Sequence, residues 1–160
     1  MQRAGALLDF QRKAEDHCWG DLEQRFTTFY ESHYWVEDQS RSGGGSNLYA
    51  TEKIRKAIPD LFLKYGVRSV LDIPCGDFFW FKEMKLDLDS YIGGDIVVPL
   101  IASVAEKYTS PTRSFRIMDL TKDALPDCDL ILVRAALFIS ALSGSSRLSK
   151  TSPNRRSDIC

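Results

Sequence analysis

Acids and glycines follow two short apolar runs of the sequence, at the points where those runs end. The first acid is Asp72 in the segment 70–78 (VLDIPCGDF), and the second is Asp95 at the end of the segment 91–95 (YIGGD). A strand that ends in an acid and a tight turn leaves backbone N–H groups at the carboxyl edge of a parallel sheet, where open α/β sheets bind ligands. Gly76, in that turn, lets a ligand approach the backbone closely.

The spacing of the acids suits a nucleoside. Asp95 lies 19 residues after Gly76, and a carboxylate at the end of a second strand can accept hydrogen bonds from both hydroxyls of a ribose. Asp119 follows the segment 115–118 (FRIM), and a polar group at the end of a third strand could meet the amino group of an adenine. The segment 127–134 (DCDLILVR) would enter the same crevice on the other side of the first strand.

These residues need elements to position them, and the apolar runs predict alternating strands and helices. The predicted elements, in chain order, are a strand at 69–73, a helix at 78–85, a strand at 91–96, a helix at 99–108, and strands at 114–118 and 129–133. Apolar strands separated by helices indicate a parallel sheet that is covered on both faces. The sequence therefore predicts an α/β fold, a Rossmann-like three-layer sandwich with a partial parallel sheet of about four strands in the order 3-2-1-4.

Two segments precede the first strand. Residues 1–36 have the apolar spacing of an amphipathic helix, with an aromatic face that we interpret as a packing surface rather than a ligand site. Residues 40–46 (SRSGGGS) contain three consecutive glycines, which disfavour a regular element. A helix is expected over 47–65, capped by Ser46, broken or restarted at Pro59, and stopped by the glycine that follows it.

The last part of the chain changes in character. Polar residues dominate positions 143–158, and no hydrophobic period remains there, so we expect disorder over 140–160. The sequence thus divides into a helical N-terminal segment with its glycine-rich loop at 1–46, an incomplete α/β domain at 47–139, and the tail.

Composition limits the classes of function. The chain has 160 residues, of which 44% are hydrophobic and 27% charged, with a formal net charge of -1. No overall field attracts nucleic acid or an anionic membrane, and no apolar stretch approaches the roughly 20 residues that span a bilayer. The four cysteines are scattered and lack the spacing of a zinc site. We therefore expect no metal, no nucleic-acid or membrane partner, no secretory signal and a reducing cytoplasm.

Taken together, the four motifs resemble the cofactor motifs of class I S-adenosylmethionine (SAM)-dependent methyltransferases. The segment 70–77 is similar to the first motif of that family, V-L-D-x-G-C-G-x-G, with Pro74 and Phe78 where glycines usually stand. A bacterial-type subgroup carries this P-C-G-D-F/W form and an upstream S-G-x-G-S segment, which residues 42–46 match. The resemblance covers residues 35–134. It implies SAM as the cofactor and the transfer of a methyl group to an unidentified acceptor, such as a small molecule.

The resemblance also implies which residues hold the cofactor. Asp72 and Gly76 would border its methionine moiety, and Asp95 would hold its ribose. Asp119 and Leu120 would flank the adenine, and the glycine segment would close over the cofactor. The full set of implied cofactor-binding residues is Gly43, Gly45, Ser46, Asp72, Pro74, Cys75, Gly76, Asp77, Asp95, Ile96, Asp119, Leu120 and Arg134. No residue stands out as a catalytic base, and Cys75 is interpreted as a packing residue rather than a nucleophile.

A class I methyltransferase normally has a larger sheet than the four strands predicted here. Relatives often continue after the fourth strand with V-R-D-C-L-V-H-L-S, whereas residues 133–140 read VRAALFIS. Loss of one base in the Asp codon relates the two strings, so we expect a shifted reading frame from Ala135 onward. A naturally short chain with a disordered tail is the alternative.

Either way, the fourth strand would be an exposed apolar edge open to self-association. The residues expected at this edge are Leu130, Ile131, Leu132, Leu137 and Phe138. Two other functions stay open: an inactive remnant that binds SAM weakly or acts only as an interaction module, and a nicotinamide-dependent oxidoreductase. No G-x-G-x-x-G follows the first strand, which disfavours the oxidoreductase.

Overall fold

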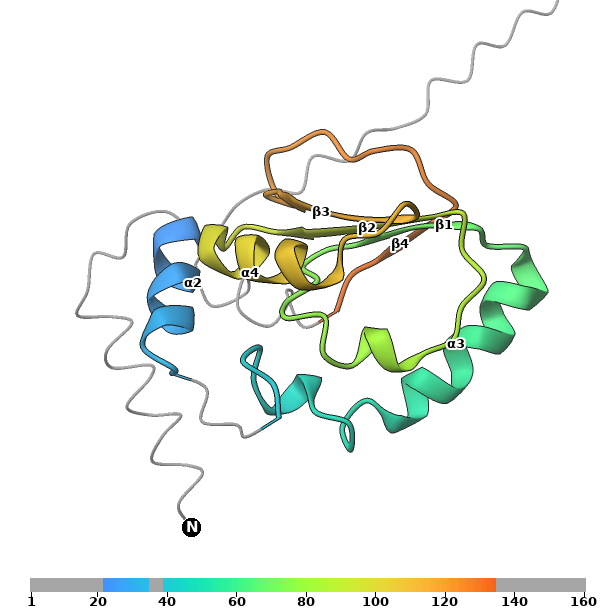
Figure 1. The fold of residues 1–160 in the computed structure, drawn as a ribbon, viewed down its shortest axis with the longest axis horizontal. Coiled ribbons are helices and arrows are strands. Elements are labelled where there is room, and N and C mark those ends of the chain that lie inside the picture. Colours follow the sequence, from blue (N-terminus) through green and yellow to red (C-terminus); the bar gives the residue numbers. More distant parts are fainter. Residues whose placement is uncertain (1–21, 35–38, 135–160) are drawn as a thin grey trace, which may run out of the picture.

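A four-stranded parallel sheet forms the centre of the molecule (Figure 1). The computed structural model describes residues 22–34 and 39–134. The strands are β1 (Ser69–Asp72), β2 (Ser90–Asp95), β3 (Arg113–Ile117) and β4 (Leu130–Leu132), and their order across the sheet is β3-β2-β1-β4. The predicted α/β fold and strand order are therefore confirmed.

Parallel pairing brings the ends of the strands to one edge. Asp72 at the end of β1 pairs with Gly93 on β2 and with Leu132 on β4. Asp95, at the end of β2, pairs with Ile117 on β3. The turns that follow β1, β2 and β3 consequently lie side by side at the carboxyl edge of the sheet, which is where the acids were expected to meet.

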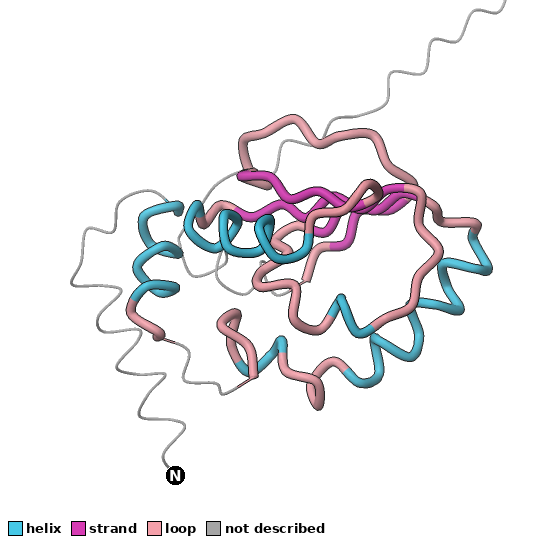
Figure 2. Tube along the Cα trace, in the orientation of Figure 1, coloured by secondary structure: helices cyan, strands magenta, loops and turns pink. Residues whose placement is uncertain are grey.

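The two faces of the sheet carry different layers. Helices α3 (Glu52–Tyr65) and α4 (Val98–Tyr108) lie on one face, with α2 (Leu22–Glu31) beside α4 (Figure 1). The other face is covered by the segment 118–129, which contains no helix (Figure 2). Each face has its own core. The one on the helical side is the larger, and the one under 118–129 is built on Leu71, Ile73 and Met118.

The start of α3 differs from the prediction. Ser46 does not cap this helix, because residues 44–46 form a single 3-10 turn and a further turn follows before the helix begins at Glu52. In that second turn the side-chain oxygen of Asn47 accepts a hydrogen bond from the N–H of Ala50 at 2.7 Å. Local side-chain bonding of this kind competes with helix formation and delays its start.

The course of α3 also differs. Pro59 neither breaks nor restarts the helix, which runs through it without interruption. Ile58 and Phe62, on either side, are buried in the core, and we attribute the continuity to this packing, which outweighs the one backbone hydrogen bond that proline cannot donate. Gly66 ends the helix with a φ of 65°, as predicted.

The prediction of a helix at 78–85 is wrong. Only Phe81–Glu83 form a 3-10 turn, because Phe78 has a φ of 59°, outside the right-handed helical region. The Phe78 ring is fully buried and is held in an aromatic cluster. Its centroid lies between 5.1 and 5.6 Å from the ring centroids of Phe81, Tyr91, Tyr108 and Phe115. Aromatic packing thus takes the place of helix formation after β1.

The N-terminal helix is shorter than predicted. Within the described residues α2 ends at Glu31, and His33 follows with a φ of 51°. The rest of the helix predicted over 1–36 lies mostly outside the described residues, as do the predicted tail at 140–160 and the residues from Ala135 onward. No helix within 22–34 or 39–134 is both long and apolar enough to cross a bilayer.

Strand β4 is an edge strand in the described sheet. Ile131 is 45% exposed, and Leu130 and Leu132 are half-buried. Leu137 and Phe138, which were expected to extend this apolar edge, lie outside the described residues.

The aromatic cluster predicts the effect of truncating Phe78. Phe78→Ala should lower the free energy of unfolding by about 3–5 kcal/mol, because it leaves a cavity among four rings. Urea unfolding followed by circular dichroism measures this. Leu63→Ala is the matched control, since Leu63 is 85% exposed. Equal effects of the two substitutions would contradict the role given to Phe78.

Candidate functional site

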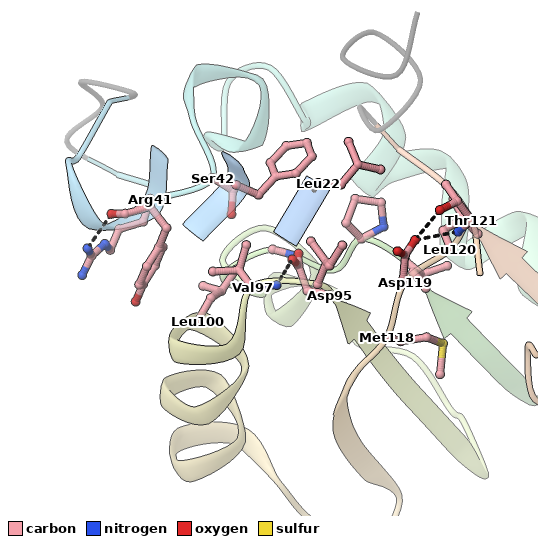
Figure 3. Close-up of a pocket in the computed structure, with 16 residues that line it drawn as sticks. Leu22, Arg41, Ser42, Asp95, Val97, Leu100, Met118, Asp119, Leu120 and Thr121 are labelled. Carbon is pink, nitrogen blue, oxygen red and sulfur yellow. Dashed lines mark hydrogen bonds between the residues drawn. The ribbon is translucent and has the colours of Figure 1, made fainter. Parts of the chain in front are cut away.

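A pocket opens at the carboxyl edge of the sheet (Figure 3). Its floor comes from the turns after β1, β2 and β3, and its outer wall comes from α2 and the segment before the glycines. The lining residues are Leu22, Phe26, Tyr30, Arg41, Ser42, Ile73, Pro74, Gly76, Asp95, Ile96, Val97, Leu100, Met118, Asp119, Leu120 and Thr121. Most of these side chains are apolar, and two carboxylates stand among them.

The pocket brings together about half of the residues implied by the resemblance. Those that line it are Pro74, Gly76, Asp95, Ile96, Asp119 and Leu120. Those that do not line it are Gly43, Gly45, Ser46, Asp72, Cys75, Asp77 and Arg134. The acid at the end of β2 and the acid just after β3 therefore line one cavity, whereas Asp72, Cys75 and Asp77 of the first motif do not line it.

Asp95 links the first two turns of the floor. Its Oδ2 accepts a hydrogen bond from the N–H of Gly76 at 3.1 Å, and its Oδ1 accepts one from the N–H of Val97 at 3.1 Å. The residue is only 5% exposed, and this burial raises the pKa of Asp95 although the backbone donors of Val97, Gly76 and Ile96 oppose the rise. A buried carboxylate with donors on both oxygens is held in one orientation.

Asp119 stands at the other end of the pocket and makes a local turn. Its Oδ1 accepts hydrogen bonds from the N–H of Thr121 at 2.8 Å and from the Thr121 hydroxyl at 2.6 Å. Burial acts to raise the pKa of Asp119, but these hydrogen bonds and the nearby Lys122 hold it below its usual value. Asp119 Oδ2 is buried and receives no hydrogen bond of good geometry, although Lys122 Nζ lies 3.2 Å away as an ion pair.

Asp72 lies behind the pocket rather than in it. Its side chain is 1% exposed, and it accepts a hydrogen bond from the Tyr91 hydroxyl at 2.8 Å. Burial raises the pKa of Asp72 to about 7, although the Tyr91 hydrogen bond acts to lower it. Asp72 does not line the pocket, and the expectation that it borders a ligand stays a prediction.

Asp77 does not line the pocket either. Its carboxylate accepts hydrogen bonds from the Ser40 hydroxyl at 3.0 and 3.1 Å and from the N–H of Arg41 at 2.8 Å. The N–H of Asp77 donates in turn to the Ser42 hydroxyl at 2.9 Å. Asp77 therefore fastens the segment 40–42 to the first turn, and Arg41 and Ser42, rather than the glycines after them, line the pocket.

Gly76 leaves room for this contact. A Cβ added to Gly76 would come within 2.3 Å of the Ser42 Oγ, and the φ of Gly76 is 57°. Both the space and the backbone conformation therefore require glycine here.

Cys75 and Arg134 contact segments next to the pocket without lining it. Cys75 is buried, and its sulfur would lie 3.1 Å from a Cβ at Gly93, which fits the packing role expected for it. Burial raises the pKa of the Cys75 thiol well above its usual value. Arg134 donates to the carbonyl oxygen of Gly45 at 2.5 Å, so it ties the glycine segment to the chain after β4.

Sequence reasoning missed the outer wall. Leu22, Phe26 and Tyr30 line the pocket from α2, on the aromatic face that was interpreted as a packing surface alone. Arg41 lies over the Tyr30 ring at 4.1 Å and donates to the Tyr30 carbonyl oxygen at 3.1 Å, which joins α2 to the segment 40–42. Nothing local in the sequence signals this contact, because it depends on where the first turn holds Arg41.

Comparison with known proteins assigns no family. No protein family matches the chain, and no curated protein matches it either. Nowhere in the described part of the chain do three His, Cys, Asp or Glu side chains gather as a metal ion would require.

The buried acid Asp72 predicts a pH-dependent stability. Because its pKa is raised from 3.8 to about 7 in the folded chain, the folded state holds a proton that the unfolded state releases. The stabilisation is present at low pH and is lost as the pH rises through about 7. The free energy of unfolding should fall by about 1 kcal/mol between pH 6 and pH 8 for this reason.

Asp72→Asn, which stays neutral and can still accept a hydrogen bond from Tyr91, should remove this fall in the free energy of unfolding, as measured by urea unfolding at the two pH values. Asp60→Asn, at an exposed position, should keep it. An Asp72→Asn protein with the original pH dependence would refute the assignment.

Proposed function

We propose that this chain binds SAM in the pocket and belongs to a methyltransferase that acts on an unidentified acceptor. The observation that carries the proposal is that Asp95, at the end of β2, and Asp119, just after the neighbouring parallel strand β3, line one pocket together with Gly76. An acid at the end of the second strand suits a ribose, and one at the end of the third suits an adenine amino group.

The two acids have the hydrogen-bonding capacity that an adenosine needs. A carboxylate can accept about four hydrogen bonds, and Asp95 receives one on each oxygen in good geometry. Capacity therefore remains on each oxygen for a ribose hydroxyl. Asp119 Oδ2 forms an ion pair with Lys122 Nζ at 3.2 Å but receives no hydrogen bond of good geometry, so it keeps capacity to accept one from an amino group.

The apolar lining suits the adenine ring. Ile96, Val97 and Leu100 line one part of the pocket, and Met118 and Leu120 line another. Side chains of this kind can hold a flat ring between them. The residues present thus fit the adenosine part of SAM.

When bound, SAM supplies a methyl group activated by the adjacent sulfonium. The residues of this chain would bind and orient that group, and the wall formed by Leu22 and Phe26 would keep water from it. An acceptor that is already a good nucleophile needs no base from the protein. We therefore assign no catalytic base among the described residues.

A second candidate is binding without turnover. The exposed apolar edge at β4 favours it, because Ile131 offers a surface for another chain, including a second copy. A turnover assay with SAM and candidate acceptors separates an enzyme from such a module. We propose the cytoplasm as the compartment for either, since Cys75 and Cys128 are free thiols.

Binding of S-adenosylhomocysteine (SAH) tests the proposal. Calorimetric titration of the full chain with SAH should show binding, and Asp95→Ala should abolish it, because the ribose loses its acceptor. Asp60→Ala, at an exposed position, should bind like the parent chain. Circular dichroism must show that the Asp95 variant is folded, since the N–H groups of Gly76 and Val97 lose their partner. Unchanged affinity in a folded Asp95→Ala protein, or tighter binding of NAD than of SAH, would contradict the assignment.

A further inference from the structure

The Ser42 hydroxyl is a hydrogen-bond donor placed at the pocket wall. It is half-buried, lines the pocket, and accepts a hydrogen bond from the N–H of Asp77 at 2.9 Å. Within residues 22–34 and 39–134, no acceptor takes the proton of this hydroxyl. A hydroxyl can donate one hydrogen bond while accepting another, so Ser42 can donate to a ligand without giving up its contact with Asp77.

The segment Ser40–Ser42, here called the clasp, is held firmly for a loop. Ser40 is buried, and its hydroxyl donates to the Asp77 carboxylate while accepting from the N–H of Ser42 at 3.2 Å. The N–H of Arg41 donates to the same carboxylate at 2.8 Å. Because Asp77 bonds the clasp through both its carboxylate and its N–H, the position of the Ser42 hydroxyl depends on Asp77.

The order of groups along the pocket tells which end of the ligand reaches the clasp. In Figure 3, Asp119, Asp95 and Ser42 follow one another across the view, with Asp95 in the middle. The N–H of Gly76 bonds Asp95, and Gly76 also abuts Ser42. If adenine lies at Asp119 and ribose at Asp95, the amino-acid tail of the ligand extends past Gly76 towards Ser42.

The tail of SAM and SAH ends in a carboxylate, for which a hydroxyl donor is a suitable partner. Hydrogen bonds to a charged acceptor are about twice as strong as neutral ones. The carboxylate of Asp77 does not oppose this binding from within the pocket, since it does not line the cavity and is occupied by the donors of Ser40 and Arg41.

We propose that Ser42 recognises the amino-acid carboxylate of the adenosyl ligand and that Asp77 is the positioning residue that presents it. This inference rests on the proposed function, because it takes the adenosine end of the ligand to lie at Asp95 and Asp119. It makes Ser42 a residue that distinguishes SAM and SAH from adenosine compounds without an amino-acid tail.

Two probes that differ only in the tail test the inference. SAH carries the amino acid, and 5′-methylthioadenosine keeps the nucleoside and the sulfur but lacks it. In calorimetric titrations of the full chain, Ser42→Ala should weaken SAH binding roughly 10- to 100-fold, as expected for one charge-assisted hydrogen bond, and should leave the affinity for 5′-methylthioadenosine unchanged. Ser110→Ala, in the turn before β3 and outside this pocket, should change neither affinity.

Asp77→Asn tests the positioning role. Asparagine has fewer acceptor sites for Ser40 and Arg41, so SAH binding should weaken while 5′-methylthioadenosine binding stays the same. The double variant with Ser42→Ala should bind SAH no more weakly than Ser42→Ala alone, because both act through one hydroxyl. Should Ser42→Ala fail to fold, the two probes applied to Asp77→Asn carry the test.

The outcomes are distinguishable. Suppose that the parent chain binds both probes. If Ser42→Ala and Asp77→Asn then keep the parent affinity for both probes, or lose affinity for both equally, the inference is overturned and the proposed function stands. If the double variant binds SAH much more weakly than Ser42→Ala alone, Asp77 does not act through Ser42 and its positioning role is overturned. If the parent chain binds neither probe, the proposed function fails and the inference fails with it.

Discussion

The carboxylate of Asp95, hydrogen-bonded to the N–H groups of Gly76 and Val97, is the interaction on which the site depends. It joins the turn after β1 to the end of β2, two segments that parallel pairing only places side by side. A carboxylate buried to this degree is costly unless its oxygens are satisfied, and here the backbone satisfies them. The floor of the pocket is thus fixed before any ligand arrives, which lowers the entropy lost on binding.

The sequence predicted what parallel pairing dictates and missed what long-range side-chain contacts dictate. Acids at the ends of β2 and β3 had to meet, because the carboxyl ends of parallel strands share an edge. The helix predicted after β1 does not form, because Phe78 has a positive φ and its ring packs into an aromatic cluster instead. The role of Asp77 was equally hidden, since its partner Ser40 lies 37 residues earlier in the chain. No local pattern signals a contact over that separation.

The acids at the ends of β1 and β2 differ in where they lie: Asp95 lines the pocket and Asp72 does not. Asp72 is buried behind the pocket, where the negative charge of Asp95 adds to the effect of burial in favouring its neutral form. Because the pKa of Asp72 is about 7, Asp72 takes up a proton as the pH falls through that value, which removes one negative charge at the junction of β1 and β2. Two buried carboxylates of like charge would repel each other. Protonation of Asp72 therefore relieves this repulsion.

The outer wall is coupled to the floor through the clasp. Asp77 fixes Arg41, and Arg41 stacks on Tyr30 of α2, so the apolar wall of α2 is tied to the turn after β1 by a chain of direct contacts. A group that bonds Ser42 acts on the same segment that holds this wall. Recognition of a ligand's tail and exclusion of water from its reactive end would then be linked events, because one short loop takes part in both. This coupling follows from contacts present without ligand, and it gives Gly76 a second constraint besides its φ, since any side chain there would displace the loop.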